Sequence, residues 1–190
     1  MAQEIEVRFR LTAPEGLQAR LHAAGAKRVP RVLETNRILD TGDRRLLAAD
    51  CGLRVREWHS LDGRQKTGAT LTFKGPRSSS QVKSREEVET PVADATATLA
   101  ILERLGFREA ITYQKRREEW RLGECVVALD ELPQLGWYVE IEGPAVSAVD
   151  AARARLDLTD VACERDTYVH LAEQHGQVLP DGPRRLMFPT

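Results

Sequence analysis

The stretch Glu4-Ile-Glu-Val-Arg-Phe-Arg-Leu11 alternates charged and apolar residues with a period of two. Successive side chains of a β-strand point to opposite faces of its sheet, so this alternation predicts a strand with one buried apolar face. The apolar face carries Ile5, Val7, Phe9 and Leu11. The opposite face carries Glu4, Glu6, Arg8 and Arg10. A strand whose second face is wholly charged is unusual, and this charged face directs the rest of the interpretation.

The same in-phase pattern returns along the chain. Further strands are expected near 28–41, 52–59, 69–75, 82–90, 110–121, 124–131 and 137–143. Helices are expected from Thr12 to Gly25 and near 94–105, 147–157 and 164–175. Eight strands mostly in hairpin order predict an α+β fold built on a closed eight-stranded antiparallel β-barrel, with the charges in its lumen and the helices packed outside. We expect residues 1–175 to form this domain and residues 176–190 to form a Pro-rich tail, loosely ordered or packed as an extended arm.

Composition excludes several classes of protein. The 190 residues include 28 Lys and Arg against 29 Asp and Glu, which argues against a nucleic-acid coat or a polybasic membrane binder. No apolar run approaches eighteen residues, and the N-terminal residues contain no apolar signal segment. Cys51, Cys125 and Cys163 are scattered, which is typical of reduced thiols. We therefore expect a cytoplasmic protein whose partners include neither DNA nor a membrane.

Acids and bases on the charged faces point to a metal–polyphosphate site. The acids are Glu4, Glu6, Glu87, Glu89, Asp130, Glu140 and Glu142, and the bases are Arg8, Arg54, Arg56, Lys74, Arg85, Lys115 and Arg117. Carboxylates two residues apart on one strand lie about 7 Å from each other and repel unless a cation lies between them. Such hard oxygen ligands suit Mg²⁺ or Mn²⁺, and Arg and Lys suit phosphate oxygens. An unfilled lumen with this charge would be costly, so we expect a charged ligand inside it.

At these residues the sequence resembles a known family. Glu4-Ile-Glu-Val-Arg8 is similar to the ExExK signature of the CYTH superfamily, the triphosphate tunnel metalloenzymes. The resemblance continues in order through Asp40-Thr41, Leu53–Arg56, Leu71–Pro76, Arg85–Glu89, Lys115–Arg117, Val127–Asp130 and Leu135–Glu142, and covers about residues 3–175. Two positions depart from the family pattern. Arg8 stands in place of the signature Lys, and Asn36-Arg-Ile-Leu stands where an aromatic residue is expected before Asp40.

The resemblance implies a fold and a chemistry. The family includes class IV adenylate cyclases, thiamine triphosphatases, inorganic triphosphatases and RNA 5′-triphosphatases, and its closed barrel binds a triphosphate and a divalent metal in the lumen. We therefore expect a Mg²⁺- or Mn²⁺-dependent enzyme whose partner is a small-molecule triphosphate, with a homodimer as the candidate assembly. The expected metal ligands are Glu4, Glu6, Glu89, Asp130, Glu140 and Glu142. The expected triphosphate-binding residues are Arg8, Arg54, Arg56, Lys74, Arg85, Lys115 and Arg117, and the expected catalytic residues are Glu4, Glu6, Glu87 and Lys115.

Three function hypotheses follow from these residues. The first is hydrolysis of the terminal phosphoanhydride of an inorganic, thiamine or nucleoside triphosphate. The alternative is a class IV adenylate cyclase that converts ATP to cyclic AMP and pyrophosphate, because the position of the substrate decides between the two outcomes. The third is a non-catalytic polyphosphate-binding module. Trp58, Tyr113 and Tyr138 share the charged faces and could either stack on a substrate ring or fill the ends of the barrel.

Overall fold

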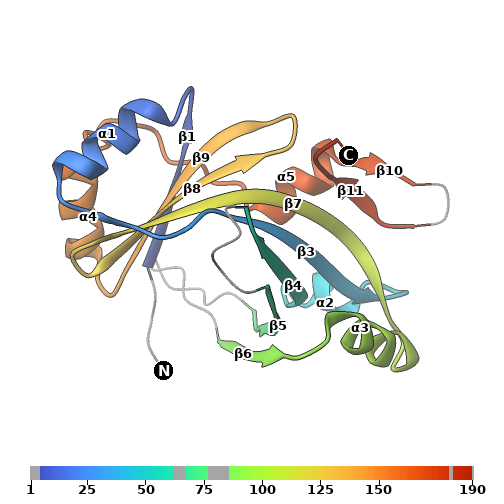
Figure 1. The fold of residues 1–190 in the computed structure, drawn as a ribbon. Helices are drawn as coiled ribbons and strands as arrows, with labels where there is room; N and C mark the ends of the chain where they lie inside the picture. The colour runs from blue at the N-terminus through green and yellow to red at the C-terminus, as the bar shows by residue number, and fades with distance from the viewer. Residues whose placement is uncertain (1–4, 62–66, 77–85, 180–181, 190) are drawn as a thin grey trace. The chain divides into compact units, whose positions relative to one another are not determined.

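Antiparallel strand pairing dominates the computed structural model, which describes residues 5–61, 67–76, 86–179 and 182–189 (Figure 1). The strand order is β1-β9-β8-β7-β3-β4-β5-β6. The bounds are β1 Ile5–Leu11, β3 Val32–Thr41, β4 Gly52–Ser60, β5 Gly68–Lys74, β6 Glu87–Val92, β7 Phe107–Leu122, β8 Cys125–Leu132 and β9 Gly136–Gly143. This mainly antiparallel sheet with its flanking helices confirms the predicted α+β class.

The chain divides into two compact units. Unit 1 comprises Met1–Val32 and Arg116–Arg165, and unit 2 comprises Leu33–Lys115 and Asp166–Thr190. Strand β7 contributes residues 116–122 to unit 1 and residues 107–115 to unit 2. Over the described residues the strand order is an open path that starts at β1 and ends at β6. The closed barrel that the sequence suggests is therefore not confirmed and stays a prediction.

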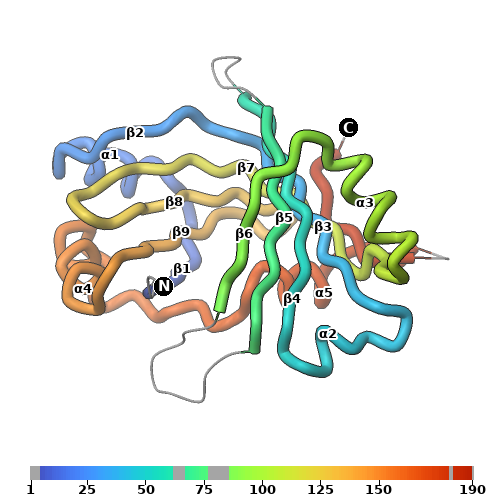
Figure 2. The backbone as a smooth tube through the Cα atoms, turned by 90° about the horizontal axis from the view of Figure 1, so that it is seen from below, coloured from blue at the N-terminus to red at the C-terminus, as the bar shows by residue number. Residues whose placement is uncertain are grey.

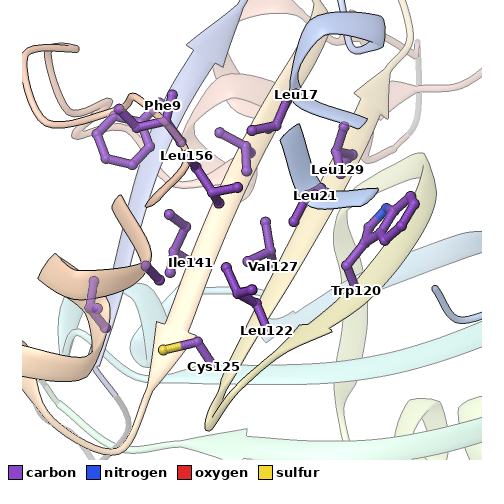
Figure 3. Packing of buried hydrophobic residues seen from close by; sticks show 14 residues of the cluster. Phe9, Leu17, Leu21, Trp120, Leu122, Cys125, Val127, Leu129, Ile141 and Leu156 are labelled. Atoms are coloured by element: carbon purple, nitrogen blue, oxygen red, sulfur yellow. The ribbon is translucent and has the colours of Figure 1, made fainter. Parts of the chain in front are cut away.

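Unit 1 has one apolar and one charged sheet face, as the alternation in β1 predicts. Helices α1 (Glu15–Ala23) and α4 (Val146–Arg155) cover the apolar face (Figure 1). Five sheet residues, Phe9, Val127, Leu129, Val139 and Ile141, share one buried cluster with Leu17 and Leu21 of α1, with Val149 and Ala152 of α4, and with Leu156, which directly follows α4 (Figure 3). Burying these side chains contributes roughly 1.5–3 kcal/mol for each large one.

Local signals place the ends of the unit 1 elements. Helix α1 begins after Pro14, which makes no side-chain cap, and so starts later than the expected Thr12. Gly25 follows the helix with a φ of 71°, a backbone angle that glycine adopts without strain.

The sheet of unit 1 continues beyond its long strands. Figure 2 shows β8 between β7 and β9, and the short strand β2 (Lys27–Arg28) pairs with β7.

Unit 2 is built on β3, β4, β5 and β6 with residues 107–115 of β7 (Figure 2). Helix α3 (Ala95–Arg104) is capped by Asp94, whose side chain accepts from the backbone N–H of Ala97. Its Leu102 packs in one cluster with Leu39, Leu53, Val55 and Ala69 of the sheet. The short helix α2 (Arg45–Ala48), which the sequence analysis did not predict, begins where the carboxylate of Asp40 accepts from two backbone N–H groups.

The C-terminal residues of unit 2 pack as an extended arm, one of the two forms expected for the tail. Helix α5 (Tyr168–His175) begins at a Thr167 cap. Strands β10 (Gln177–Val178) and β11 (Arg184–Leu186) follow it, and β11 pairs in parallel with Ile111–Tyr113 of β7. Among the described residues, no helix has the length and apolar character that a membrane crossing needs.

Candidate functional site

The charged face of unit 1 brings together six of the predicted site residues on four strands. Period-two alternation places their side chains opposite the residues that pack against α1 and α4. Register then aligns them, since Glu6 lies opposite Glu142, Arg8 opposite Glu140, and Arg117 opposite Asp130. The six residues are Glu6 and Arg8 of β1, Arg117 of β7, Asp130 of β8, and Glu140 and Glu142 of β9.

Arg8 binds two carboxylates at once. Its Nε donates to Oε1 of Glu140 at 2.8 Å, and its Nη2 donates to the same oxygen. Nη2 also donates to Oε1 of Glu6 at 2.8 Å. Arg8 and Glu140 are both buried, so water screens this pair little.

Arg117 completes the same network from the other side. Its Nε donates to Oδ1 of Asp130 at 2.7 Å, and its Nη2 donates to Oδ2 at 2.6 Å, a two-point pair. Nη2 of Arg117 also donates to Oε2 of Glu140. Glu140 is therefore held between two arginines, and Asp130 is fully buried behind Arg117.

Glu6 has a perturbed pKa. Burial raises the pKa of Glu6 above its ordinary value of 4.5, and the negative charge of Glu140 raises it further. Arg8 opposes both effects by stabilising the ionised form. Two acids this close favour either a shared proton or a bound cation.

The donor set on the unit 1 face fits a divalent metal in part. Glu6, Glu140 and Glu142 share two neighbouring strands and supply the hard oxygens that Mg²⁺ and Mn²⁺ prefer. Arginines occupy both oxygens of Glu140 and both oxygens of Asp130, and Asp130 is in addition fully buried, so it fits a metal less well. Within the described ranges, no three Asp, Glu, His or Cys side chains are grouped as ligands of one ion, and Glu4 lies outside those ranges.

The polar face of unit 2 carries most of the predicted phosphate-binding residues. Register places Arg54 opposite Thr72, Arg56 opposite Thr70, and Lys74 opposite Glu87. Lys115 comes from β7 and Glu34 and Asn36 come from β3. Arg85 lies outside the described residues.

Glu34 is the central acid of this face. Its Oε2 lies 3.5 Å from Nζ of Lys115 and 3.6 Å from Nε of Arg56. Lys115 is only 2% exposed, and its Nζ lies 4.9 Å from the centre of the Tyr168 ring. The sequence analysis missed Glu34 and Tyr168. The period-two spacing of Glu34 and Asn36 was a signal for the first, whereas no local pattern marks Tyr168.

Arg54 is buried with an incomplete set of partners. Its Nη2 donates to Oγ1 of Thr72 at 3.3 Å and lies 3.6 Å from Oε2 of Glu89. Its Nε is buried and has no hydrogen-bond acceptor in the described part of the chain, and the same holds for Oγ1 of Thr70. Burial lowers the pKa of Arg54, and the nearby charge of Arg56 lowers it further. This face therefore keeps buried donors without acceptors.

Glu87 and Glu89 belong to unit 2, whereas the other described acids of the predicted metal site belong to unit 1. Nζ of Lys74 lies 2.6 Å from Oε2 of Glu87, and Oγ1 of Thr72 donates to Oε2 of Glu89 at 2.6 Å. Glu87 and Glu89 thus serve as partners of polar side chains on their own face. The single site that the sequence suggests stays a prediction.

Acid–base pairing inside each unit corrects one step of the sequence argument. According to that step, a charged sheet face costs too much free energy unless a charged ligand binds to it. Arg8, Arg117 and Lys74 instead pair with carboxylates on their own faces, which removes much of that cost. The argument for a ligand therefore depends on the buried donors that lack acceptors, above all Nε of Arg54.

The three aromatic residues on the polar faces differ in exposure. Tyr138 and Tyr113 are buried, and Tyr113 packs against Tyr168 with ring centres 6.4 Å apart. Trp58 is partly exposed, and its indole lies over Gly68 on the neighbouring strand. Tyr113 and Tyr138 therefore serve in packing, and Trp58 alone of the three keeps an accessible ring.

Comparisons with known proteins agree with this fold. A protein of Methanocaldococcus jannaschii named "Putative adenylate cyclase" is 26% identical over 139 residues, 73% of this chain and 75% of the relative. The solved structure of a "putative adenylate cyclase" from Vibrio parahaemolyticus superposes with a TM-score of 0.76 at 18% identity, covering 88% of this chain and 95% of the other. A Hippeastrum protein described as a "Putative adenylyl cyclase" with a dominant triphosphatase activity has a TM-score of 0.65 at 20% identity, covering 95% and 98% of the two chains.

The match to a family model decides the classification. The model described as the CYTH domain matches residues 2–160, which include every predicted site residue. The charged strand faces, the strand order and this match agree, and the chain belongs to the CYTH domain family.

Proposed function

We propose that this protein is a divalent-metal-dependent enzyme that binds a triphosphate and hydrolyses its terminal phosphoanhydride bond. The observation that carries the proposal is the buried guanidinium of Arg54, whose Nε has no acceptor among the described residues. A buried donor without an acceptor costs about 1–3 kcal/mol, so an anionic oxygen from a ligand would stabilise it. Arg56 and Lys115 share this face and would bind further phosphate oxygens.

The unit 1 face supports the metal part of the proposal through its donor chemistry. Glu6, Glu140 and Glu142 are the residues that would hold Mg²⁺ or Mn²⁺. In metal-dependent phosphoryl transfer, such an ion neutralises the charge that develops on the phosphoryl group. In hydrolysis, a water oxygen forms a bond to the terminal phosphorus, the bridging P–O bond breaks, and orthophosphate leaves. The Hippeastrum relative, with its dominant triphosphatase activity, favours this reaction.

Cyclisation of ATP is the second candidate, and the name of the Methanocaldococcus jannaschii relative favours it. In that reaction the ribose 3′-oxygen bonds to the α-phosphorus and pyrophosphate leaves. The same phosphate-binding residues would serve both reactions, because the choice depends on which oxygen is aligned with which phosphorus.

Product analysis separates these candidates. The purified chain would receive ATP, inorganic triphosphate or thiamine triphosphate separately, with Mg²⁺ or Mn²⁺. Orthophosphate without cyclic AMP supports hydrolysis, whereas cyclic AMP with pyrophosphate would overturn it in favour of the cyclase. Binding of triphosphate with no product from any substrate would identify a binding module.

A matched pair of variants connects the activity to the unit 2 face. Arg54→Gln should lower turnover and triphosphate affinity at least about tenfold, since it removes a charged donor from buried surroundings. Arg45→Gln is the control. It removes the same charge from an exposed side chain of unit 2 that pairs with the nearby Asp43, and it should leave turnover and affinity unchanged. Equal activity of Arg54→Gln and wild type would contradict the assignment of Arg54.

A further inference from the structure

A pocket of about 300 Å³ lies within unit 2, at the end of the sheet where β3 ends and β7 begins. Strand β7 pairs with both β3 and β11, so this pocket takes its walls from three parts of the chain. None of the described residues assigned above to the triphosphate lines it. Its volume falls within the range of small-molecule sites, which is about 300–1,000 Å³. The pocket is therefore large enough for a ligand of its own.

Three arginines line this pocket, one from each part of the chain. Arg44 follows β3, Arg108 lies near the start of β7, and Arg184 is the first residue of β11. Nη2 of Arg44 donates to Oε1 of Glu173 at 3.1 Å, and the Arg44 side chain is 53% exposed. Arg108 and Arg184 have no hydrogen-bond or ion-pair partner in the described part of the chain. Positive charges that converge on one pocket repel each other, so an anion bound between them would stabilise them.

Two acids also line the pocket, and both have partners elsewhere. The carboxylate of Asp40 accepts from three backbone N–H groups around the start of α2. Oε2 of Glu109 accepts from Oγ1 of Thr112 at 2.9 Å, and Oε1 of Glu109 lies 3.4 Å from Nε of Arg37. Within the described ranges, neither acid forms an ion pair with any of the three arginines. The positive charge of the pocket is thus only partly balanced by the protein.

We propose that this pocket binds a diphosphate group, apart from the site assigned above to the triphosphate. A guanidinium binds phosphate oxygens through two parallel N–H groups, and a diphosphate offers enough oxygens for three arginines. A free pyrophosphate ion and a nucleoside diphosphate both carry this group, and Val178 and Pro183 of the lining would contact the organic part of the second. The proposal needs neither a metal nor turnover, so it does not rest on the proposed function.

Hydrogen–deuterium exchange locates the ligand. The wild-type chain would be compared without ligand, with pyrophosphate and with ADP, all in the presence of chelator. Peptides that contain Arg44, Arg108 or Arg184 should exchange at least about threefold more slowly with pyrophosphate, since a bound ligand suppresses local opening. A larger effect of ADP would also support the proposal and would make an organic diphosphate the source. Slower exchange confined to peptides from β4 and β5 would place the ligand on the polar face that carries Arg54 and would overturn the proposal.

Two neighbouring residues of β11 give a matched pair of variants. Arg184 lines the pocket, whereas Arg185 is exposed and is not among the lining residues, because successive side chains of a strand point to opposite faces. In Arg184→Gln, the pyrophosphate concentration that gives half of the effect at the Arg44 peptide should rise about tenfold, since a charged donor is lost. Arg185→Gln removes the same charge and should behave as wild type. Arg108→Gln should match Arg184→Gln and serves if that variant does not fold.

The variant Arg54→Gln separates the two sites of unit 2. It should leave the slowed exchange of the pocket peptides unchanged, because Arg54 is not a lining residue. Loss of that slowed exchange in Arg54→Gln would overturn the proposal. Equal half-effect concentrations in Arg184→Gln, Arg108→Gln and Arg185→Gln, or no slowed exchange at the pocket with either ligand, would overturn it as well.

Discussion

Arg117 and Asp130 lie directly opposite each other on β7 and β8 and form a two-point ion pair through Nε–Oδ1 and Nη2–Oδ2. Asp130 is fully buried and the side chain of Arg117 is 12% exposed, so neither charge has water as a substitute partner. The sequence analysis predicts Asp130 as a metal ligand, and in this structure both of its oxygens accept from Arg117, which it anchors.

Asp130→Asn should therefore lower the free energy of unfolding by about 3 kcal/mol, because it removes the carboxylate charge that binds the buried guanidinium of Arg117 at two points. The loss should be the same with chelator and with Mn²⁺. Urea denaturation under both conditions measures it. Asp150→Asn, which alters an exposed pair with Arg153, is the control and should change the free energy of unfolding by less than about 0.5 kcal/mol. A loss seen only with metal present would contradict the anchor role.

Glu118 offers a second stability test within unit 1. It is 3% exposed, and its carboxylate accepts from Nε1 of Trp120 at 2.9 Å, Nε2 of Gln18 at 3.0 Å, and Nη2 of Arg28. Glu118→Gln should cost about 1–3 kcal/mol, because its amide group turns a donor toward other donors. Thermal and urea unfolding of this variant, beside the exposed Glu124→Gln, would check the result. Equal stability of the two variants would argue that Glu118 is solvated in solution.

The raised pKa of Glu6 makes the free energy of unfolding depend on pH in a defined direction. The pKa of Glu6 in the folded state is raised above its ordinary value of 4.5. At pH values between 4.5 and this raised pKa, the folded state therefore binds more protons than the unfolded state. Stability from this group is therefore lost as pH rises from about 4.5 toward the raised pKa. Glu6→Gln removes that loss, so the stability of the variant relative to wild type should increase with pH across the window.

Urea denaturation in chelator at a series of pH values from about 4 to 7 would measure this relative stability. The effect should be small, since nearly half of the Glu6 side chain is exposed to screening solvent. A difference between variant and wild type that is flat with pH, or that falls as pH rises, would contradict the raised pKa.

Thr70 and Thr72 form a matched pair on β5. Oγ1 of Thr70 is buried without a partner in the part of the chain that the structure describes, whereas Oγ1 of Thr72 accepts from Arg54 and donates to Glu89. Thr72→Val should cost about 1–3 kcal/mol of stability, and Thr70→Val should cost nothing or stabilise slightly. The free energies of unfolding of the two variants decide this.

Thr70→Val should weaken triphosphate binding, although it should not lower the free energy of unfolding. Thr70 lies opposite Arg56. If the proposed function is right, the Thr70 hydroxyl donates to a phosphate oxygen, and its loss should weaken inorganic triphosphate binding about fivefold in calorimetry. A folded Thr70→Val with wild-type affinity would remove this hydroxyl from the site.

Alternation within single strands made much of this protein predictable. The pattern in β1 correctly separates Phe9, which is buried under the helices, from Arg8 and Glu6 on the other face. What the sequence could not supply is register, which pairs residues from strands far apart in the chain. Glu34 and Lys115 are 81 positions apart, and no local pattern shows that their side chains meet. Helix α2 was missed because Asp40 starts it from the preceding strand.

The contact between Trp58 and Gly68 restricts how this family member can evolve. A Cβ atom at position 68 would collide with the indole of Trp58, which covers the bare backbone across the β4–β5 pair. Any larger residue at 68 must therefore follow a change at 58, since the reverse order passes through an intermediate with two side chains in one space. Positions 58 and 68 are therefore expected to covary in an alignment of close homologues, with a residue larger than glycine at 68 found only where 58 carries a smaller side chain than Trp.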